Sequence, residues 1–139
     1  MPGDRRIALI TGSTSGIGLA IAKRLVQAGN AVALNSFEAD ADAALAEVAA
    51  AGPGTVRYFS ADLSRPETGY DLVQQVVAAF GQLDVLVNNA GVQKVASIEA
   101  FPPADWDRIR AISLDSAFHT IRAAVPGMVE RGWGRIINV

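Results

Sequence analysis

Three glycines, Gly12, Gly16 and Gly18, stand close together in the segment TGSTSGIG at positions 11–18, which directly follows the apolar run 7–10. At a turn from strand to helix, residues without side chains let the backbone come close to a pyrophosphate. The negative charge of the pyrophosphate is stabilised there by free backbone amides and by the positive end of the helix dipole. Three hydroxyl residues between the first two glycines add donors. The spacing differs from G-x-G-x-x-G and lacks the G-K-[ST] ending of a P-loop. The segment therefore predicts a nucleotide-phosphate loop outside the kinases and ATPases, the alternative being a tight turn that binds nothing.

Residues for other kinds of catalysis are sparse. The chain has no cysteine and one histidine, His119, so thiolate nucleophiles are excluded and we expect no metal site. His119 falls in the last helical stretch, where a structural or interface role is expected. Asp105, Asp107 and Asp115 are expected to be solvated helix charges rather than metal ligands.

The composition is that of one globular domain. Of 139 residues, 50% are hydrophobic and 19% are charged, and the net charge is -2. The twelve basic residues are scattered, so we expect neither nucleic acid nor a membrane surface as partner. The opening residues 1–6 precede an apolar run too short for an export signal, and the lack of cysteine suits a reducing compartment, so we expect a cytoplasmic protein.

Short apolar runs alternate with longer stretches of helical period, a pattern typical of an α/β fold with helices on both faces of a parallel sheet. The expected strands are Ile7–Thr11, Ala31–Asn35, Val56–Ser60, Asp84–Asn88 and Arg135–Val139. The expected helices cover about Gly16–Ala28, Ala39–Ala51, Pro66–Phe80 and Pro103–Arg131. No linker or repeat interrupts the pattern, which predicts a single domain over residues 1–139.

The last helical region has two irregular positions. We expect Ser113 to mark a joint between two helical pieces, and Pro126 to kink the helix or end it early near Val125. An apolar stripe runs from Leu114 to Met128 and could face the sheet or a partner subunit.

The glycine loop and the segment Asn88–Gly91 resemble the two signatures of the short-chain dehydrogenase/reductase family, in the expected order and distance. The resemblance covers the whole chain and implies a doubly wound, Rossmann-like sheet of order 3-2-1-4-5, with a dinucleotide across the carboxyl ends of its strands. Within the family, the stretches around Phe37, Gln93 and Trp133 are similar to those of the bacterial 3-hydroxybutyrate dehydrogenases. The strand expected at 135–139 stops with the chain, so we expect an incomplete family domain.

The resemblance also implies a set of cofactor-binding residues. Those expected to wrap the pyrophosphate and its ribose are Gly12, Ser15, Gly16, Ile17 and Gly18. The backbone expected to run beside the ribose toward the nicotinamide is that of Asn89, Ala90 and Gly91. The alternative for the asparagines Asn88 and Asn89 is that they tie neighbouring loops together.

Two further positions match ligand contacts of the family. Asp62, followed by Leu63, matches an aspartate that bonds the adenine amino group, and Gln93 matches a glutamine that contacts the substrate carboxylate. A turn cap at Asp62 and a solvated loop residue at Gln93 are the alternatives.

The choice between NAD and NADP can be argued from charge. A 2′-phosphate needs a nearby cation, whereas Ser15, Ser36 and Phe37 at the relevant positions are not basic. The acid that often recognises the free ribose is also absent at Ser36, but the Asn-small-Phe pattern is similar to that of the 3-hydroxybutyrate enzymes, which use NAD. We therefore expect NAD.

The family's acid/base tyrosine, followed four residues later by a lysine, cannot be found in this sequence. Tyr58 and Tyr70 are followed at that distance by Asp62 and Gln74. At the position of the family's relay asparagine stands Ser113, which puts the proton relay in doubt.

The resemblance implies a parent enzyme that oxidises a small 3-hydroxy acid to a 3-oxo acid with NAD, and we expect the 139-residue chain alone to be inactive. Three alternatives stay open. One is a 3-oxoacyl reductase, which acts on a ketone. Another is a non-catalytic nucleotide-binding or subunit-interaction protein, in which the long last helix pairs with a partner. Whatever its activity, the protein could associate as a homo-oligomer through the helical region 103–131. The last is a broken gene product without a function.

Overall fold

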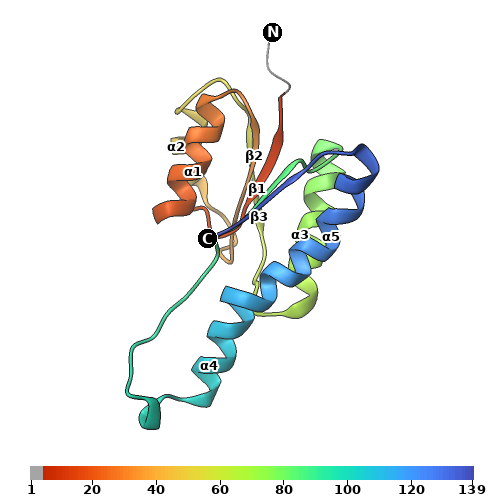
Figure 1. Cartoon of the computed structure of the whole chain (residues 1–139). Helices are drawn as coiled ribbons and strands as arrows, with labels where there is room; N and C mark the ends of the chain where they lie inside the picture. The colour runs from red at the N-terminus through yellow and green to blue at the C-terminus, as the bar shows by residue number, and fades with distance from the viewer. Residues whose placement is uncertain (1–4) are drawn as a thin grey trace.

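The computed structural model describes residues 5–139, in which five strands form one parallel sheet of order β3-β2-β1-β4-β5 (Figure 1). The strands are β1 (Ile7–Ile10), β2 (Ala31–Ser36), β3 (Val56–Ser60), β4 (Val85–Asn88) and β5 (Arg135–Asn138). The α/β fold and the strand order expected from the sequence are confirmed. Residues 1–4, which belong to the opening considered above as an export signal, lie outside the described residues.

Helices cover both faces of the sheet (Figure 1). Helices α1 (Gly16–Gln27) and α2 (Asp42–Ala49) lie on one face, and α3 (Pro66–Phe80) and α5 (Ser116–Arg131) on the other. Helix α4 (Pro103–Arg110) projects beyond the carboxyl ends of the strands, after an extended segment with a short 3-10 turn at Ile98–Ala100. None of the helices over residues 5–139 is long and apolar enough to cross a membrane.

The central strand β1 shows why both faces must be covered. Leu9 is buried in the core against α3 and α5, while Ala8 and Ile10 are buried in the core against α1 and α2. Because side chains alternate along a strand, one apolar run supplies two separate cores. All backbone groups of β1 then point sideways, to β2 and β4.

Two side-chain hydrogen bonds join β4, β5 and α5, between the buried residues Thr120 and Asn88 and the exposed Asn138. Thr120 Oγ1 donates to Asn88 Oδ1 at 2.6 Å, and Asn88 Nδ2 donates to Asn138 Oδ1 at 3.0 Å. Thr120 is fully buried, so its hydroxyl has to find this partner inside the protein. These two hydrogen bonds therefore fix the position of α5 on the sheet.

The last helical region departs from its expected form in one respect. The expected joint at Ser113 is confirmed, because a π-helical turn (Ala111–Asp115) separates α4 from α5. The expected early end near Val125 is wrong, since α5 continues through Pro126 to Arg131. Pro126 lies on the exposed side of α5, where water can satisfy the carbonyl that loses its partner, and the buried side still holds the helix on the sheet.

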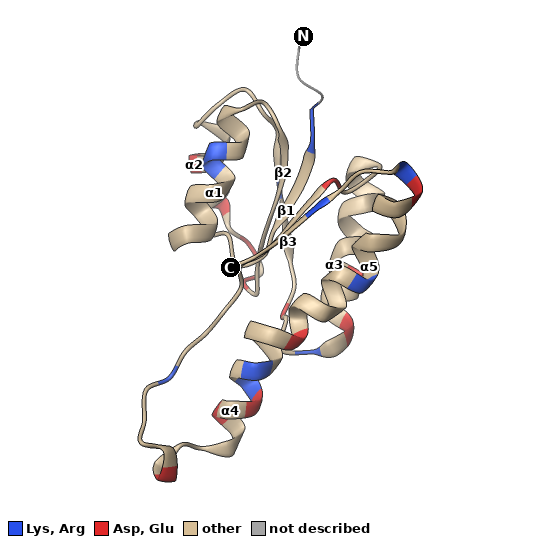
Figure 2. Ribbon diagram, viewed as in Figure 1, with Lys and Arg blue, Asp and Glu red and all other residues tan. Residues whose placement is uncertain are grey.

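The apolar stripe of that region divides between two environments. Met128 is buried in the core, whereas Leu114 and Phe118 are 65% and 64% exposed. Helix α4 has no buried residue at all and carries charges of both signs (Figure 2). The expected second helix is also shorter than the alanine-rich sequence suggested, starting at Asp42 and ending at Ala49.

Candidate functional site

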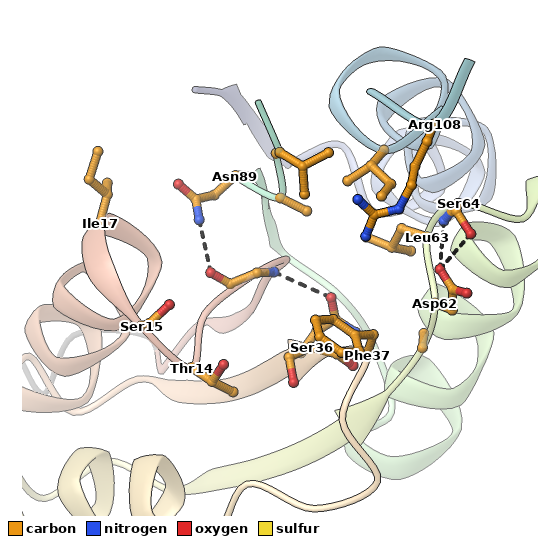
Figure 3. A pocket seen from close by; sticks show the side chains of 17 residues that line it. Thr14, Ser15, Ile17, Ser36, Phe37, Asp62, Leu63, Ser64, Asn89 and Arg108 are labelled. Carbon is orange, nitrogen blue, oxygen red and sulfur yellow. Dashed lines mark hydrogen bonds between the residues drawn. The ribbon is translucent and has the colours of Figure 1, made fainter. Parts of the chain in front are cut away.

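A cavity of about 440 Å³ opens at the carboxyl ends of β1 to β4, the edge where doubly wound sheets bind their ligands (Figure 3). Its lining comes from the loop after β1 and the start of α1, from the ends of β2, β3 and β4, and from α4 and the turn that follows it. The lining residues are Gly12, Thr14, Ser15, Ile17, Asn35, Ser36, Phe37, Ala61, Asp62, Leu63, Ser64, Asn89, Ala90, Gly91, Val92, Arg108 and Ile112.

The loop after β1 approaches its neighbours too closely for side chains. Gly12 has a φ of +60°, and a Cβ there would lie 2.9 Å from Ala90 Cα. A Cβ on Gly18 would lie 2.4 Å from the Gly12 carbonyl oxygen. The first turn of α1 is thus pressed onto the loop, Ser15 and Ile17 line the cavity there, and the first amides of the helix have no partner inside it. This is an arrangement that suits an anionic group.

Two side chains hold that loop against the end of β4. Thr11 Oγ1 accepts hydrogen bonds from the Asn89 and Ala90 amides, at 3.0 and 2.9 Å. Asn89 Nδ2 donates to the Thr11 carbonyl oxygen at 3.2 Å and to the Gly12 carbonyl oxygen at 3.0 Å, the second of which is drawn in Figure 3. The Asn89 side chain therefore ties two loops together, while the backbone of Ala90 and Gly91 lines the cavity.

Asn35, at the end of β2, holds the other side of the loop. Its Oδ1 accepts from the Gly12 amide at 3.3 Å, and its Nδ2 donates to the Phe59 carbonyl oxygen at 3.1 Å. Its own amide donates to Ser13 Oγ at 2.9 Å. Asn35 was not predicted as a site residue, because one buried asparagine at a strand end carries no pattern that marks this bridging position.

Asp62 lies at the end of the cavity nearest to α3. Its carboxylate accepts from the Ser64 hydroxyl at 2.7 Å and from the Ser64 amide at 3.0 Å. These two bonds, helped by the charges of Arg108 and Arg65, hold the pKa of Asp62 below its ordinary value. Arg108 reaches this end of the cavity from α4 (Figure 3), a position that the sequence reasoning missed because α4 reads only as a solvated helix.

Most of the residues predicted for the cofactor come together here. The lining includes Gly12, Ser15, Ile17, Phe37, Asp62, Leu63, Asn89, Ala90 and Gly91. Gly16 and Gly18 shape the loop and do not line the cavity. Gln93 is exposed and stands outside it.

Ser113 is also outside the lining, and it contacts the segment after β4. Its hydroxyl accepts from the Val92 amide at 3.3 Å and lies 3.4 Å from the Val92 carbonyl oxygen, to which it can donate. The π-helical turn is thus bound to the residue that follows Gly91. Among residues 5–139, no three carboxylate or histidine side chains form a group that could hold a metal ion.

A family model described as short chain dehydrogenase matches residues 6–139. The chain belongs to the short chain dehydrogenase family. The chain is 56% identical over 135 residues to the D-beta-hydroxybutyrate dehydrogenase of Cupriavidus necator, covering 96% of this chain and 52% of that protein. It is 52% identical over 136 residues to the enzyme of the same name from Rhizobium meliloti, covering 96% of this chain and 53% of the relative. This short chain dehydrogenase sequence thus spans about half the length of these curated relatives.

Solved short chain dehydrogenase structures share the fold. A metagenomic short-chain oxidoreductase in complex with NADP matches with a TM-score of 0.88 and 35% identity, over 94% of this chain and 60% of that one. An NAD+-bound xylitol dehydrogenase matches with a TM-score of 0.86 and 34% identity, over 94% of this chain and 51% of that one. Members with this fold therefore bind either dinucleotide.

Proposed function

We propose that this chain is the NAD-binding part of a dehydrogenase that oxidises a small 3-hydroxy acid to a 3-oxo acid. The observation that carries the proposal is the close-packed loop after β1, where neither Gly12 nor Gly18 has room for a side chain; we call this loop the glycine cradle. The chain is also more than 50% identical to two D-beta-hydroxybutyrate dehydrogenases. Because the chain spans about half of those relatives, the oxidation is proposed for the whole protein. We place it in the cytoplasm, in keeping with a sequence free of cysteine.

The residues of the cavity fit a dinucleotide. The cradle and the open amides of the first turn of α1 would hold the pyrophosphate. Asp62, ionised over the physiological range, would accept a hydrogen bond from the adenine amino group, with Leu63 beside it. The backbone at Ala90 and Gly91 would flank the nicotinamide half. Bound there, NAD supplies the hydride acceptor for oxidation of an alcohol carbon.

The proposal favours NAD over NADP because of charge at the end of β2. Ser36 and Phe37 line the cavity there and neither carries a cation for a 2′-phosphate. Arg108 is the one basic residue among the described lining residues, and it comes from α4, near Asp62 and Ser64, and not from the end of β2 (Figure 3).

A chain that binds NAD but does not carry out the oxidation need not contain the family's acid/base tyrosine and lysine. No tyrosine in the 139 residues is followed four positions later by a lysine. We therefore propose that the chain alone binds NAD without turning it over. In the whole protein, Gln93 would contact the substrate carboxylate, and Ser113 would stand at the position of the relay asparagine.

We further propose that the protein is a homo-oligomer that associates through the helical region 103–131. Trp106, Leu114 and Phe118 of this region are large apolar side chains left exposed on α4, the π-helical turn and α5. Together they would give a partner subunit an apolar surface to cover.

Calorimetric titration of the 139-residue chain with NAD+, followed by an assay for reduction of NAD+ with D-3-hydroxybutyrate, tests the proposal. We expect binding without turnover. No binding of either dinucleotide would refute the proposed cofactor role, and turnover would refute the proposed inactivity of the chain. In the same assay, the full-length protein is expected to oxidise D-3-hydroxybutyrate.

A further inference from the structure

Two hydroxyl groups meet where β2 ends at the cavity. Ser36 lines the cavity, and its Oγ lies 2.8 Å from the Oη of Tyr58 on the neighbouring strand β3. Tyr58 pairs with Leu34 in the sheet, so Ser36, two residues further, has its side chain on the same face. The Tyr58 ring packs against the core beneath α1 and α2, which fixes the position of its hydroxyl.

The direction of the hydrogen bond between these hydroxyls follows from counting protons. Tyr58 Oη lies 3.2 Å from the Ser36 carbonyl oxygen and is also hydrogen-bonded to the Glu38 carbonyl oxygen. A carbonyl only accepts and a phenol has one proton, so Tyr58 must use its proton on a carbonyl. The bond at 2.8 Å can then form only if Ser36 Oγ donates to Tyr58 Oη.

Ser36 is left with acceptor capacity alone. Its proton is engaged by Tyr58, and one of its two lone pairs accepts from the Glu38 amide at 3.3 Å. What remains for a ligand in the cavity is the second lone pair. A ribose 2′-hydroxyl can donate to it, whereas a 2′-phosphate has acceptor oxygens and negative charge and is repelled.

We propose that the Ser36–Tyr58 pair is the group that selects NAD over NADP in this protein, in place of the acid that often follows the second strand. The inference rests on the proposed function, since it assumes a dinucleotide with its adenosine ribose at the end of β2. Ser36 touches the ribose hydroxyl, and Tyr58 is a positioning residue that sets the direction of the Ser36 proton. A carboxylate at this position accepts a hydrogen bond from the ribose 2′-hydroxyl and repels a 2′-phosphate by its charge. The neutral Ser36–Tyr58 pair favours the 2′-hydroxyl because Ser36 can only accept a hydrogen bond from the ligand.

Binding of three probes, NAD+, 2′-deoxy-NAD+ and NADP+, to the chain and two variants separates this role from a structural one. We expect the unmodified chain to bind 2′-deoxy-NAD+ about fivefold more weakly than NAD+, the size of one hydrogen bond. Ser36→Ala should remove this difference. Tyr58→Phe frees the Ser36 proton to donate into the cavity, so the preference for NAD+ over NADP+ should shrink at least about fivefold.

A matched control is Ser60→Ala. The Ser60 hydroxyl contacts the same loop, 3.5 Å from the Phe37 carbonyl oxygen, without lining the cavity. It should leave all three affinities unchanged, and circular dichroism checks that every variant is folded.

Three results would overturn the inference while leaving NAD binding intact. In the first, Ser36→Ala still discriminates against 2′-deoxy-NAD+. In the second, Tyr58→Phe weakens NAD+ and NADP+ equally, as a loosened loop would. In the third, the unmodified chain prefers NADP+. If the unmodified chain binds none of the probes, the proposed function fails, and the inference fails with it.

Discussion

Gly12 is constrained twice, by its positive φ and by Ala90, whose Cα would clash with a Cβ on Gly12 at 2.9 Å. We expect Gly12→Ala to cost about 2 kcal/mol of unfolding free energy and to weaken NAD+ binding at least about tenfold, because relieving the clash moves the loop away from the end of β4. Urea unfolding and calorimetric titration measure the two effects.

Gly29→Ala is the matched control, since Gly29 has a φ of +86° but open space where a Cβ would go. It should cost about 1 kcal/mol from backbone strain alone and leave NAD+ binding unchanged. Equal loss of binding in both variants would contradict a specific role for the approach of Gly12 to Ala90.

The pKa of Asp62 is lowered first by the Ser64 hydroxyl and then by the Ser64 amide. A folded-state pKa below the unfolded one means that this carboxylate adds stability above its ordinary pKa and loses it as the pH falls through the lowered value. Ser64→Ala should therefore raise the pKa of Asp62 toward normal, and Ser64→Thr should preserve the lowering. Carbon NMR of the Asp62 carboxyl between about pH 2 and about pH 6 measures this, and an unchanged pKa in Ser64→Ala would contradict it.

At the scale of elements, the Thr120–Asn88–Asn138 chain joins α5 to the sheet. Thr120→Val keeps the shape but leaves the buried Asn88 Oδ1 without its donor, so we expect a loss of about 1–3 kcal/mol and faster hydrogen exchange along β5. Thr120→Ser retains the hydroxyl and should keep the β5 amides protected. Similar exchange in both variants would show that the bond does not hold β5.

Elements and site differ in how well the sequence predicts them. Strands such as β1 are predictable because an apolar run between turn residues has one interpretation, and Ser113 marked the π-helical turn. The end of α5 could not be predicted from the sequence, because the effect of Pro126 depends on which side of the helix faces water. Asn35 and Arg108 were missed for a related reason: only the packing of α4 and β2 around the cavity brings these two residues to it.

At the scale of the whole molecule, Leu114 of the π-helical turn and Phe118 at the start of α5 face outward. Leu114→Asp should shift the proposed oligomer toward monomers in sedimentation velocity of the full-length protein, because an unpaired carboxylate buried in the interface opposes association by several kcal/mol. Ala46→Asp, an exposed change on α2 across the sheet, should leave the oligomer intact. An unaltered oligomer in Leu114→Asp would place the interface elsewhere.

The bonds between Thr11 and Asn89 have a further consequence during synthesis. Strands β1, β2 and β3 are neighbours in the sheet and can pair as soon as they leave the ribosome, and Asn35 then holds one side of the glycine loop. The bonds on the other side form only when Asn89 and Ala90 follow, almost eighty residues after Thr11. Until then the part of the cavity lining that Asn89, Ala90 and Gly91 supply is absent. A nascent chain therefore acquires its nucleotide only after β4 has joined the sheet, and the cofactor can stabilise the assembled sheet but cannot guide its first pairings.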